Sequence, residues 1–225
     1  MAAPGAPSPA ISTTGDKKPA IAPVDFSAVK KANLPVVVII GGPGCGKGTQ
    51  CVKIKEKYHF AHLSTGDLLR DEAKTGTARG KQLSEKMAKG ELVPVEVVME
   101  LLKEFMAKAI TDKNIQGFLL DGFPREAPQA EALTKELGLP KAAIYFECPD
   151  DVMAKRLADR GKTSGRSDDN PDTIKKRLDV FKKQTLPVVE FYKGKNLLRV
   201  VNGNREVEAI FADVVKIMDP LKTAK

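Results

Sequence analysis

The sequence predicts an α/β fold in which helices cover both faces of a five-stranded parallel sheet. Short apolar runs rich in Val, Ile and Leu alternate along the chain with longer segments whose apolar residues have helical spacing. The first apolar run leads directly into a glycine-rich turn and then into a Lys-rich helical segment. That order is typical of a phosphate-binding site at the carboxyl edge of a parallel sheet.

The five expected strands are short, and four of them are mostly apolar. Residues 36–40 are an unbroken β-branched run, which is typical of a strand buried on both faces. The segments between the strands are long enough for crossover helices, so the strands are expected to run parallel. The other four strands are expected at residues 61–64, 118–121, 142–148 and 197–201.

The expected helices end or begin at residues that cap or interrupt helices. Pro94 and Pro149 stand where a helix accepts a proline as its first residue, and Asp150 and Asp151 stand at the positive end of a helix dipole. Pro187 interrupts a long helical segment, so a kink is expected there. The expected helices cover residues 51–58, 65 onward, 78–89, 95–110, 149–160, 171 onward and 206–218.

Two segments exceed what a minimal parallel fold needs. Two expected helices, one beginning at residue 65 and one covering 78–89, precede the long apolar helix at 95–110. One crossover helix would be enough to connect the strands. We therefore expect a small inserted domain there. Residues 161–170 are polar, contain two glycines and have no apolar anchor, so a mobile loop is expected.

The glycine-rich turn, residues 41–50, reads GGPGCGKGTQ. Glycines leave room for backbone N–H groups to point at phosphate oxygens, and the helix N-terminus that follows adds partial positive charge. The Lys47 ammonium can reach the β- and γ-phosphates of a nucleotide. The turn is therefore predicted to bind a nucleoside triphosphate.

Metal binding at this turn is expected to be indirect. The hydroxyl that usually follows the lysine as a Mg²⁺ ligand is displaced by one residue, because Gly48 precedes Thr49. Mg²⁺ is then held mainly by phosphates and water. Asp121, at the carboxyl end of a predicted strand, is expected to contact Mg²⁺ through water, and no protein residue is expected to bind the metal directly.

Composition restricts the class of protein. The 225 residues are 42% hydrophobic and 29% charged, as in a single soluble domain. The net charge of +8 suits anionic ligands, but no basic cluster has interleaved aromatic residues, so nucleic-acid binding is not expected. No apolar run has the length of a membrane span. Three cysteines without metal-ligand spacing and only two histidines, His59 and His62, predict no zinc site and a reducing compartment.

The chain is expected to consist of a disordered extension, residues 1–30, and one folded domain, residues 31–225. The first 23 residues are rich in Ala, Pro, Ser and Thr and have no periodicity. They contain two lysines and no arginine, unlike a mitochondrial presequence.

Arginines occur near the predicted strand ends and loops, whereas lysine is the common cation elsewhere. A solvated basic face would explain any single arginine. As a set beside a phosphate-binding loop they indicate a second phosphate group, because the guanidinium fork matches phosphate. The set is Arg70, Arg125, Arg156, Arg160, Arg166 and Arg177.

Four stretches of the sequence together resemble the signature motifs of adenylate kinases of the short-lid, cytosolic type: GGPGCGKGTQ, LSTGDLLRDE, LLDGFPRE and RGKTSGRSDDNPDTIKKRL. The resemblance implies a P-loop three-layer αβα fold with an AMP-binding insertion at 64–93 and a short lid at 161–170. It implies a cytoplasmic monomer that converts MgATP and AMP into two ADP and so maintains adenine nucleotide levels. It implies Mg²⁺ bound with ATP and no structural zinc, since this lid has no Cys or His.

The resemblance also implies the residues that contact ATP. Lys47 would contact the transferred phosphoryl group, with lid-side arginines around it, and Arg205 would lie where the backbone touches adenine. The implied ATP-binding residues are Gly44, Cys45, Gly46, Lys47, Gly48, Thr49, Arg156, Arg160 and Arg205. The implied catalytic residues are Lys47, Arg125, Arg160, Arg166 and Arg177.

A second set is implied for AMP. Arg125 would hold the AMP phosphate, and Gln129, on the helix that follows, would read the adenine edge. Pro128, immediately before Gln129, departs from the family pattern. The implied AMP-binding residues are Thr65, Arg70, Glu91, Leu92, Val93, Gly122, Phe123, Pro124, Arg125, Gln129, Arg166 and Arg177.

Two alternatives to an adenylate kinase are a kinase with another monophosphate substrate and a nucleotide-binding protein that is not an enzyme. UMP/CMP kinases are similar but carry Ala and Asn at the positions of Thr65 and Gln129, and an amide that can pair with adenine favours AMP. A nucleotide-binding switch without turnover would need only one nucleotide site and would have no use for the second set of arginines.

The implied mechanism needs no general base, because an AMP phosphate oxygen is already ionised at pH 7. The protein has to align two polyanions and neutralise the transferred group in a site closed to water. Asp168 and Asp169, in the lid, are expected to orient Arg160 or Arg166.

Overall fold

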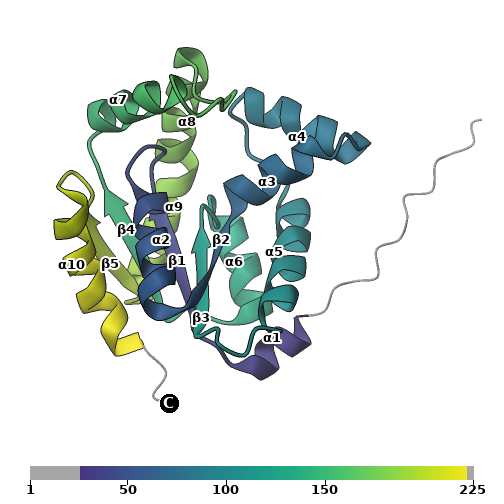
Figure 1. Cartoon of the computed structure of the whole chain (residues 1–225), viewed down its shortest axis with the longest axis vertical. Helices are drawn as coiled ribbons and strands as arrows, with labels where there is room; N and C mark the ends of the chain where they lie inside the picture. The colour runs from purple at the N-terminus through teal and green to yellow at the C-terminus, as the bar shows by residue number, and fades with distance from the viewer. Residues whose placement is uncertain (1–25, 222–225) are drawn as a thin grey trace, which may run out of the picture.

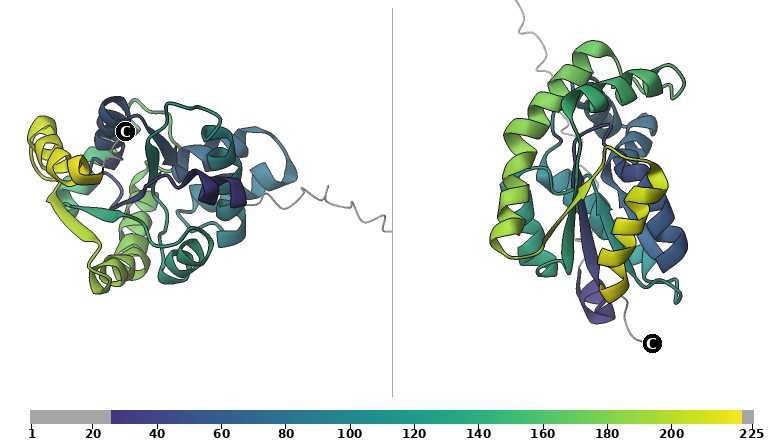
Figure 2. Two further views of the ribbon diagram at one scale, coloured as in Figure 1. Left: turned by 90° about the horizontal axis from the view of Figure 1, so that it is seen from below. Right: turned by 90° about the vertical axis from the view of Figure 1, so that its left-hand side faces the viewer.

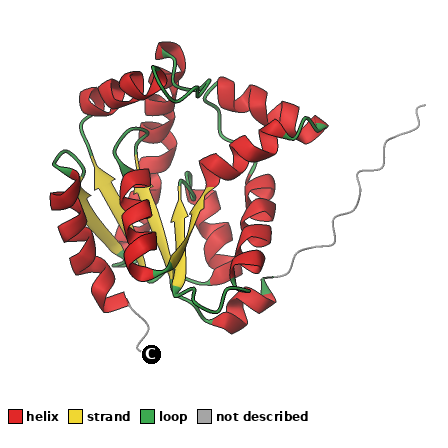
Figure 3. Cartoon of the chain, viewed as in Figure 1, coloured by secondary structure: helices red, strands yellow, loops and turns green. Residues whose placement is uncertain are grey.

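The computed structural model describes residues 26–221, which form a three-layer α/β structure (Figure 1). The five strands run parallel in the order β2-β3-β1-β4-β5. Figure 3 shows this twisted sheet between two helical layers. The strands are β1 (Val36–Gly41), β2 (Phe60–Ser64), β3 (Gly117–Asp121), β4 (Ala142–Glu147) and β5 (Leu198–Asn202). The five-stranded parallel sheet predicted from the sequence is confirmed.

The helices occupy both faces of the sheet and its carboxyl edge (Figure 2). The first five are α1 (Ser27–Ala32), α2 (Lys47–Tyr58), α3 (Thr65–Lys74), α4 (Ala78–Ala88) and α5 (Val95–Ala109). The others are α6 (Ala127–Leu137), α7 (Asp150–Gly161), α8 (Pro171–Val180), α9 (Leu186–Gly194) and α10 (Val207–Met218), with a π-helical turn at Phe181–Thr185 and a 3₁₀ turn at Asp219–Leu221.

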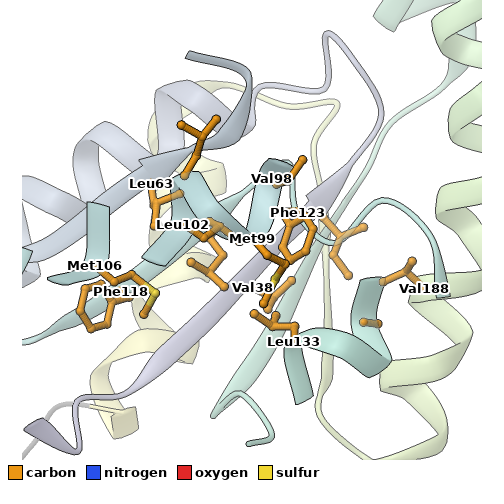
Figure 4. Close-up of a cluster of buried hydrophobic side chains, with 14 of the residues drawn as sticks. Val38, Leu63, Val98, Met99, Leu102, Met106, Phe118, Phe123, Leu133 and Val188 are labelled. Atoms are coloured by element: carbon orange, nitrogen blue, oxygen red, sulfur yellow. The ribbon is translucent and has the colours of Figure 1, made fainter. Parts of the chain in front are cut away.

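Alternating residues of the strands divide the core into two parts. Val38 of β1 faces a cluster shared with α5, α6 and α9, and Val37 and Ile39 face a second cluster shared with α2 and α10. Successive side chains of a strand point to opposite faces, so each face of a central strand is buried under its own helices. Figure 4 shows the first cluster, in which Leu102 and Phe118 are fully buried.

The N-terminal boundary of the folded part differs from the prediction. Residues 1–25 of the predicted disordered extension lie outside the described residues. Its last residues belong to α1, where Phe26 and Val29 are only 2% and 5% exposed and pack into the first core cluster. Burial of these two side chains stabilises a helix that is too short to be predicted from periodicity.

The interruption expected at Pro187 takes the form of the π-helical turn. Pro187 has no N–H to donate, which disturbs the α-helical ladder of the preceding turn. The Leu186 N–H instead bonds to the Phe181 carbonyl, five residues back. The helical rod therefore continues from α8 to α9 with one wider turn.

Within the described part of the chain, no helix combines the length and the apolar composition required to cross a membrane.

Candidate nucleotide-binding site

A cavity of about 410 Å³ lies at the carboxyl edge of the sheet. The turn after β1, the last residues of β2 and β3, and the rod formed by α8 and the π turn all contribute to its walls. A second, smaller cavity of about 60 Å³ continues from it between α3, α6 and the segment after α4. This is the edge at which the sequence predicts ligand binding.

The glycine-rich turn is shaped by residues with positive φ. Gly44 and Gly46 have φ angles of 85° and 98°, a region that side chains rarely adopt. A Cβ on Gly44 would also lie 2.5 Å from the Met153 carbonyl oxygen. The turn can therefore bring its backbone to α7 only with glycine at this position.

Lys47 is the first residue of α2, and its ammonium group points back into the turn. Nζ donates hydrogen bonds to the carbonyl oxygens of Gly41 (2.6 Å) and Gly42 (2.9 Å) and lies 3.6 Å from Cys45 Sγ. The cation is therefore held at the mouth of the turn, where phosphate oxygens would compete for the same donors. Cys45 itself is buried beneath the turn, with 1% exposure.

The two lid acids are buried and bind arginines of the helices on either side. Asp169 accepts two hydrogen bonds of 2.7 Å from Arg160 and one of 3.0 Å from Arg177. Asp168 lies 2.9 Å from Arg177. Burial raises the pKa of the Asp169 carboxyl, but the hydrogen bond and charge of Arg160 outweigh it, so the pKa lies below its usual value. The predicted pairing of a lid acid with Arg160 is present, whereas Arg166 has a different partner.

That partner is Asp67, in the first turn of α3. Its carboxylate binds Arg70 on the same helix and lies 3.5 Å from Arg166 of the lid loop. Asp67 therefore connects the inserted helices with the loop 161–170. Asp67 is not among the site residues predicted from the sequence, although its spacing of three residues from Arg70 on a helix is a usable signal.

Arg125 follows β3 and faces the cavity. Within residues 26–221 it forms no ion pair with an acidic side chain. Its Nε donates to the Gly122 carbonyl at 2.7 Å, and Thr185 of the π turn donates to the Arg125 carbonyl at 2.8 Å. Desolvation and the charge of Arg177 lower the pKa of the Arg125 guanidinium, and the charge of Asp121 opposes this shift only in part. An unpaired cation in this position favours an anionic ligand.

The smaller cavity is bounded by Thr65 and Gln129, both only 2% exposed. The Thr65 hydroxyl donates to the backbone carbonyl of Asp121 or Gly122. The Gln129 amide oxygen accepts from the Arg125 backbone N–H at 2.8 Å, and its nitrogen donates to Glu126 at 3.1 Å. One amide hydrogen therefore remains available for a ligand in the cavity.

Most of the predicted site residues line one of the two cavities. The larger is lined by Gly44, Gly46, Lys47, Gly48, Thr49, Asp121, Pro124, Arg156, Arg160 and Arg166, and the smaller by Thr65, Glu91, Val93, Phe123 and Gln129. Both are lined by Arg70, Leu92, Gly122, Arg125 and Arg177.

Two predicted residues lie elsewhere. Cys45 does not line either cavity, and the exposed Arg205 side chain binds Asp213 of α10. The structure therefore does not bring the Arg205 side chain into either cavity. Arg156 is fixed by a hydrogen bond of 3.0 Å to the Gly203 carbonyl, on the loop before α10.

Comparisons with known proteins agree with this geometry. The family model described as adenylate kinase matches residues 39–197. A carp (Cyprinus carpio) protein named adenylate kinase isoenzyme 1 is 49% identical over 196 residues, which are 87% of this chain and 100% of the carp protein. The pig (Sus scrofa) and human (Homo sapiens) proteins of that name are 50% and 49% identical over 188 residues, or 83% of this chain and 95% of each relative.

Proposed function

The chain belongs to the adenylate kinase family, and we propose that it catalyses reversible transfer of the γ-phosphoryl group of ATP to AMP, giving two ADP. The observation that carries this proposal is the placement of two cationic groups around one cavity. Lys47 holds the glycine-rich turn on one side, and Arg70, Arg125 and Arg177 lie toward the smaller cavity on the other. A protein that bound a single nucleotide would have no use for the second group.

We propose that ATP lies with its phosphates on the turn formed by residues 44–49. The backbone N–H groups, the N-terminus of α2 and the Lys47 ammonium would bind the β- and γ-phosphates. Arg160 and Arg166 would reach the transferred phosphoryl group from the lid, and Arg156 would lie on the ATP side. The support for this arrangement is that these side chains line the larger cavity.

We propose that AMP occupies the smaller cavity, with its phosphate toward Arg70, Arg125 and Arg177. The wall formed by residues 91–93 would cover the ribose and base, and the free amide hydrogen of Gln129 would donate to a ring nitrogen of adenine. The buried Thr65 hydroxyl already donates its hydrogen to a backbone carbonyl, so its oxygen would act toward the base as an acceptor of a hydrogen bond from the exocyclic amine.

The chemistry requires little of the protein beyond alignment and charge. The attacking oxygen of AMP is ionised at neutral pH, so no side chain has to remove a proton. Lys47 and the arginines neutralise the charge of the transferred group, in a cavity where water is excluded when the insertion at 64–93 and the lid at 161–170 close. Exclusion of water prevents transfer to water instead of AMP.

The residues present fit a Mg²⁺ ion that arrives with ATP and keeps most of its water. Asp121 is the carboxylate at the end of β3 and lines the larger cavity. The Thr49 hydroxyl lies one position beyond the usual ligand position. A bound Mg²⁺ would supply positive charge that neutralises the phosphates. Asp121 would accept hydrogen bonds from its water shell.

We further propose that the protein acts as a monomer in the cytoplasm, as the resemblance to the short-lid type implies.

The experiment that tests the proposal is a coupled assay of ADP formation from MgATP with AMP, CMP, UMP or GMP as acceptor. We expect a strong preference for AMP. A preference for CMP or UMP would retain the reaction and overturn the roles of Thr65 and Gln129. Bound ATP without transfer to any monophosphate would overturn the enzymatic function in favour of a switch.

A further inference from the structure

Three metal-binding side chains meet beneath the glycine-rich turn. A ligand atom of Cys51, one of His62 and one of Asp121 all lie within 4.8 Å of one another. His62 Nε2 and Asp121 Oδ2 are 3.2 Å apart. The sequence predicts no zinc site, because its three cysteines lack metal-ligand spacing and it has only two histidines.

The sheet topology brings the three residues together. β2 pairs with β3 in parallel, with His62 beside Leu119 and Ser64 beside Asp121. His62 and Asp121 therefore share the face of the sheet that Leu119 occupies, and α2 covers this face. Cys51, on the buried side of α2, completes the set with 0% exposure.

The donor atoms match the preferences of one class of cation. A thiolate, an imidazole and a carboxylate together are typical of Zn²⁺, whereas Mg²⁺ prefers oxygen ligands alone. Tetrahedral Zn²⁺ with bonds of about 2.1 Å places its nitrogen and oxygen ligands roughly 3.4 Å apart. The observed 3.2 Å between His62 and Asp121 is close to that separation. The longer separations, up to 4.8 Å, need a small rotation of the side chains.

We propose that Cys51, His62 and Asp121 form a Zn²⁺ site with three protein ligands and an open fourth position toward the larger cavity. His62 and Asp121 line that cavity and their side chains are 14% and 10% exposed, so an ion can reach them from the cavity. Binding forms a Zn–S bond to Cys51 and releases the thiol proton to water. Water or a phosphate oxygen occupies the fourth position.

Occupation of this site inhibits phosphoryl transfer. Asp121 is the carboxylate proposed above to face the water shell of nucleotide-bound Mg²⁺, so this consequence depends on the proposed function. A Zn²⁺ ion bound to Asp121 removes that acceptor and places a second divalent cation near Lys47, which repels it. The site is thus regulatory.

The binding experiment uses the full-length protein without nucleotide. Zn²⁺ affinity is measured by competition with a chromophoric chelator, and Co²⁺ serves as a spectroscopic probe because thiolate ligation gives a charge-transfer band in the near ultraviolet. Cys51→Ala and His62→Asn each remove one ligand. Their matched controls are Cys148→Ala and His59→Asn, which change a cysteine and a histidine outside the cluster; Asn suits the positive φ of 55° at residue 59.

We expect one Zn²⁺ per chain, an affinity at least about tenfold weaker in each ligand variant and unchanged affinity in the controls. The cobalt charge-transfer band should be absent only in Cys51→Ala. His62 lies partly exposed at the cavity, so His62→Asn tests the site even if the substitution of buried Cys51 impairs folding. Equal Zn²⁺ affinity in the wild type and both ligand variants, or a wild-type cobalt complex without the band, would overturn the proposal. The cluster would then contain only a His62–Asp121 hydrogen bond.

A second measurement tests the regulatory consequence. ADP formation is followed at free Zn²⁺ concentrations set by a chelating buffer, and each variant is normalised to its own rate without zinc. We expect inhibition of the wild type at the concentrations that fill the site, and at least about tenfold higher concentrations for Cys51→Ala. Full activity with the site occupied would overturn the inhibitory role. A protein that formed no ADP even without zinc would instead contradict the proposed function, while the binding result would stand.

Discussion

Arg160, at the end of α7, and Asp169, just before α8, close the lid loop on itself through two hydrogen bonds of 2.7 Å. The bidentate geometry fixes the plane of the guanidinium, and the second contact of Asp169 with Arg177 fixes the next arginine along the cavity. One buried carboxylate therefore positions two of the cations proposed to surround the transferred phosphoryl group.

We expect Asp169→Asn to lower kcat more than it raises the KM for either nucleotide. The variant keeps the shape of the side chain but loses its charge, so Arg160 and Arg177 lose their common orientation. A loss of about tenfold to a hundredfold in kcat is expected. Steady-state kinetics with MgATP and AMP test this, with Asp159→Asn, an exposed acid on α7, as the control. A normal kcat in Asp169→Asn would show that the arginines orient themselves.

The same carboxylate makes stability depend on pH. The folded-state pKa of Asp169 lies below that of an exposed Asp, about 3.9. The ionised group therefore stabilises the fold at pH values above the unfolded-state pKa, and this contribution is lost as pH falls through the folded-state pKa. Urea unfolding should find the wild type more stable than Asp169→Asn by about 1–3 kcal/mol at pH 7. The difference should shrink below pH 4 or so, and a constant difference would exclude ionisation as its cause.

We expect Lys47→Met to reduce turnover by about 10³-fold or more while the fold remains intact. Within residues 26–221 the Lys47 ammonium bonds to carbonyls and a sulfur of its own turn and to no acid, so its loss leaves no buried acid there unpaired. Turnover is measured by ADP formation and folding by circular dichroism and thermal unfolding. A variant with near-normal turnover would remove Lys47 from the catalytic residues.

Arg125 is expected to contribute to AMP turnover while lowering the stability of the protein without ligand. The guanidinium is held near Arg70 and Arg177 without an acidic ion-pair partner in the described part of the chain, which disfavours the folded state without ligand. Arg125→Ala should therefore lower kcat/KM for AMP by about 10²-fold or more and leave the free energy of unfolding unchanged or raised. Arg199→Ala, on exposed β5, is the control. A clear loss of stability in Arg125→Ala would contradict this account.

Base selectivity is expected to depend on Gln129. Gln129→Asn shortens the side chain, so the amide withdraws from the base and from the Arg125 backbone N–H. We expect kcat/KM for AMP to fall by about tenfold to a hundredfold, with a smaller change for CMP. Thr134→Ala on the same helix is the control, because the Thr134 hydroxyl bonds to the Ala130 carbonyl within α6. An equal loss for AMP and CMP would indicate that Gln129 supports the loop and does not read the base.

The parts that could be predicted from the sequence are those specified locally. The β-branched run before the glycine-rich turn and the prolines at helix starts depend on neighbours in the chain, and the resulting strands agree with the structure to within a residue or so at most ends. The sequence also predicted that the lid acids orient Arg160 or Arg166, and the structure pairs Asp169 with Arg160.

The parts that could not be predicted depend on which strands are neighbours. Strand order is a property of the whole fold, so nothing near His62 indicates that β2 lies beside β3 and brings it to Asp121. Likewise, α1 is stabilised by burial of Phe26 and Val29 under α5, with no periodic pattern of its own. Asp67 was missed because its second partner, Arg166, lies 99 residues away.

The π turn at Phe181–Thr185 sets the rotational phase of the rod formed by α8 and α9. Arg177 lies before the turn and faces the cavity, whereas Val188 and Tyr192 lie after it and face the core. One residue corresponds to about 100° around a helix axis. Deleting any one residue of the turn would rotate one half against the other and withdraw either the arginine or the apolar face. Evolution of this segment is therefore constrained in length more strictly than in composition, and single-residue deletions there are expected to be rejected even where most substitutions are accepted.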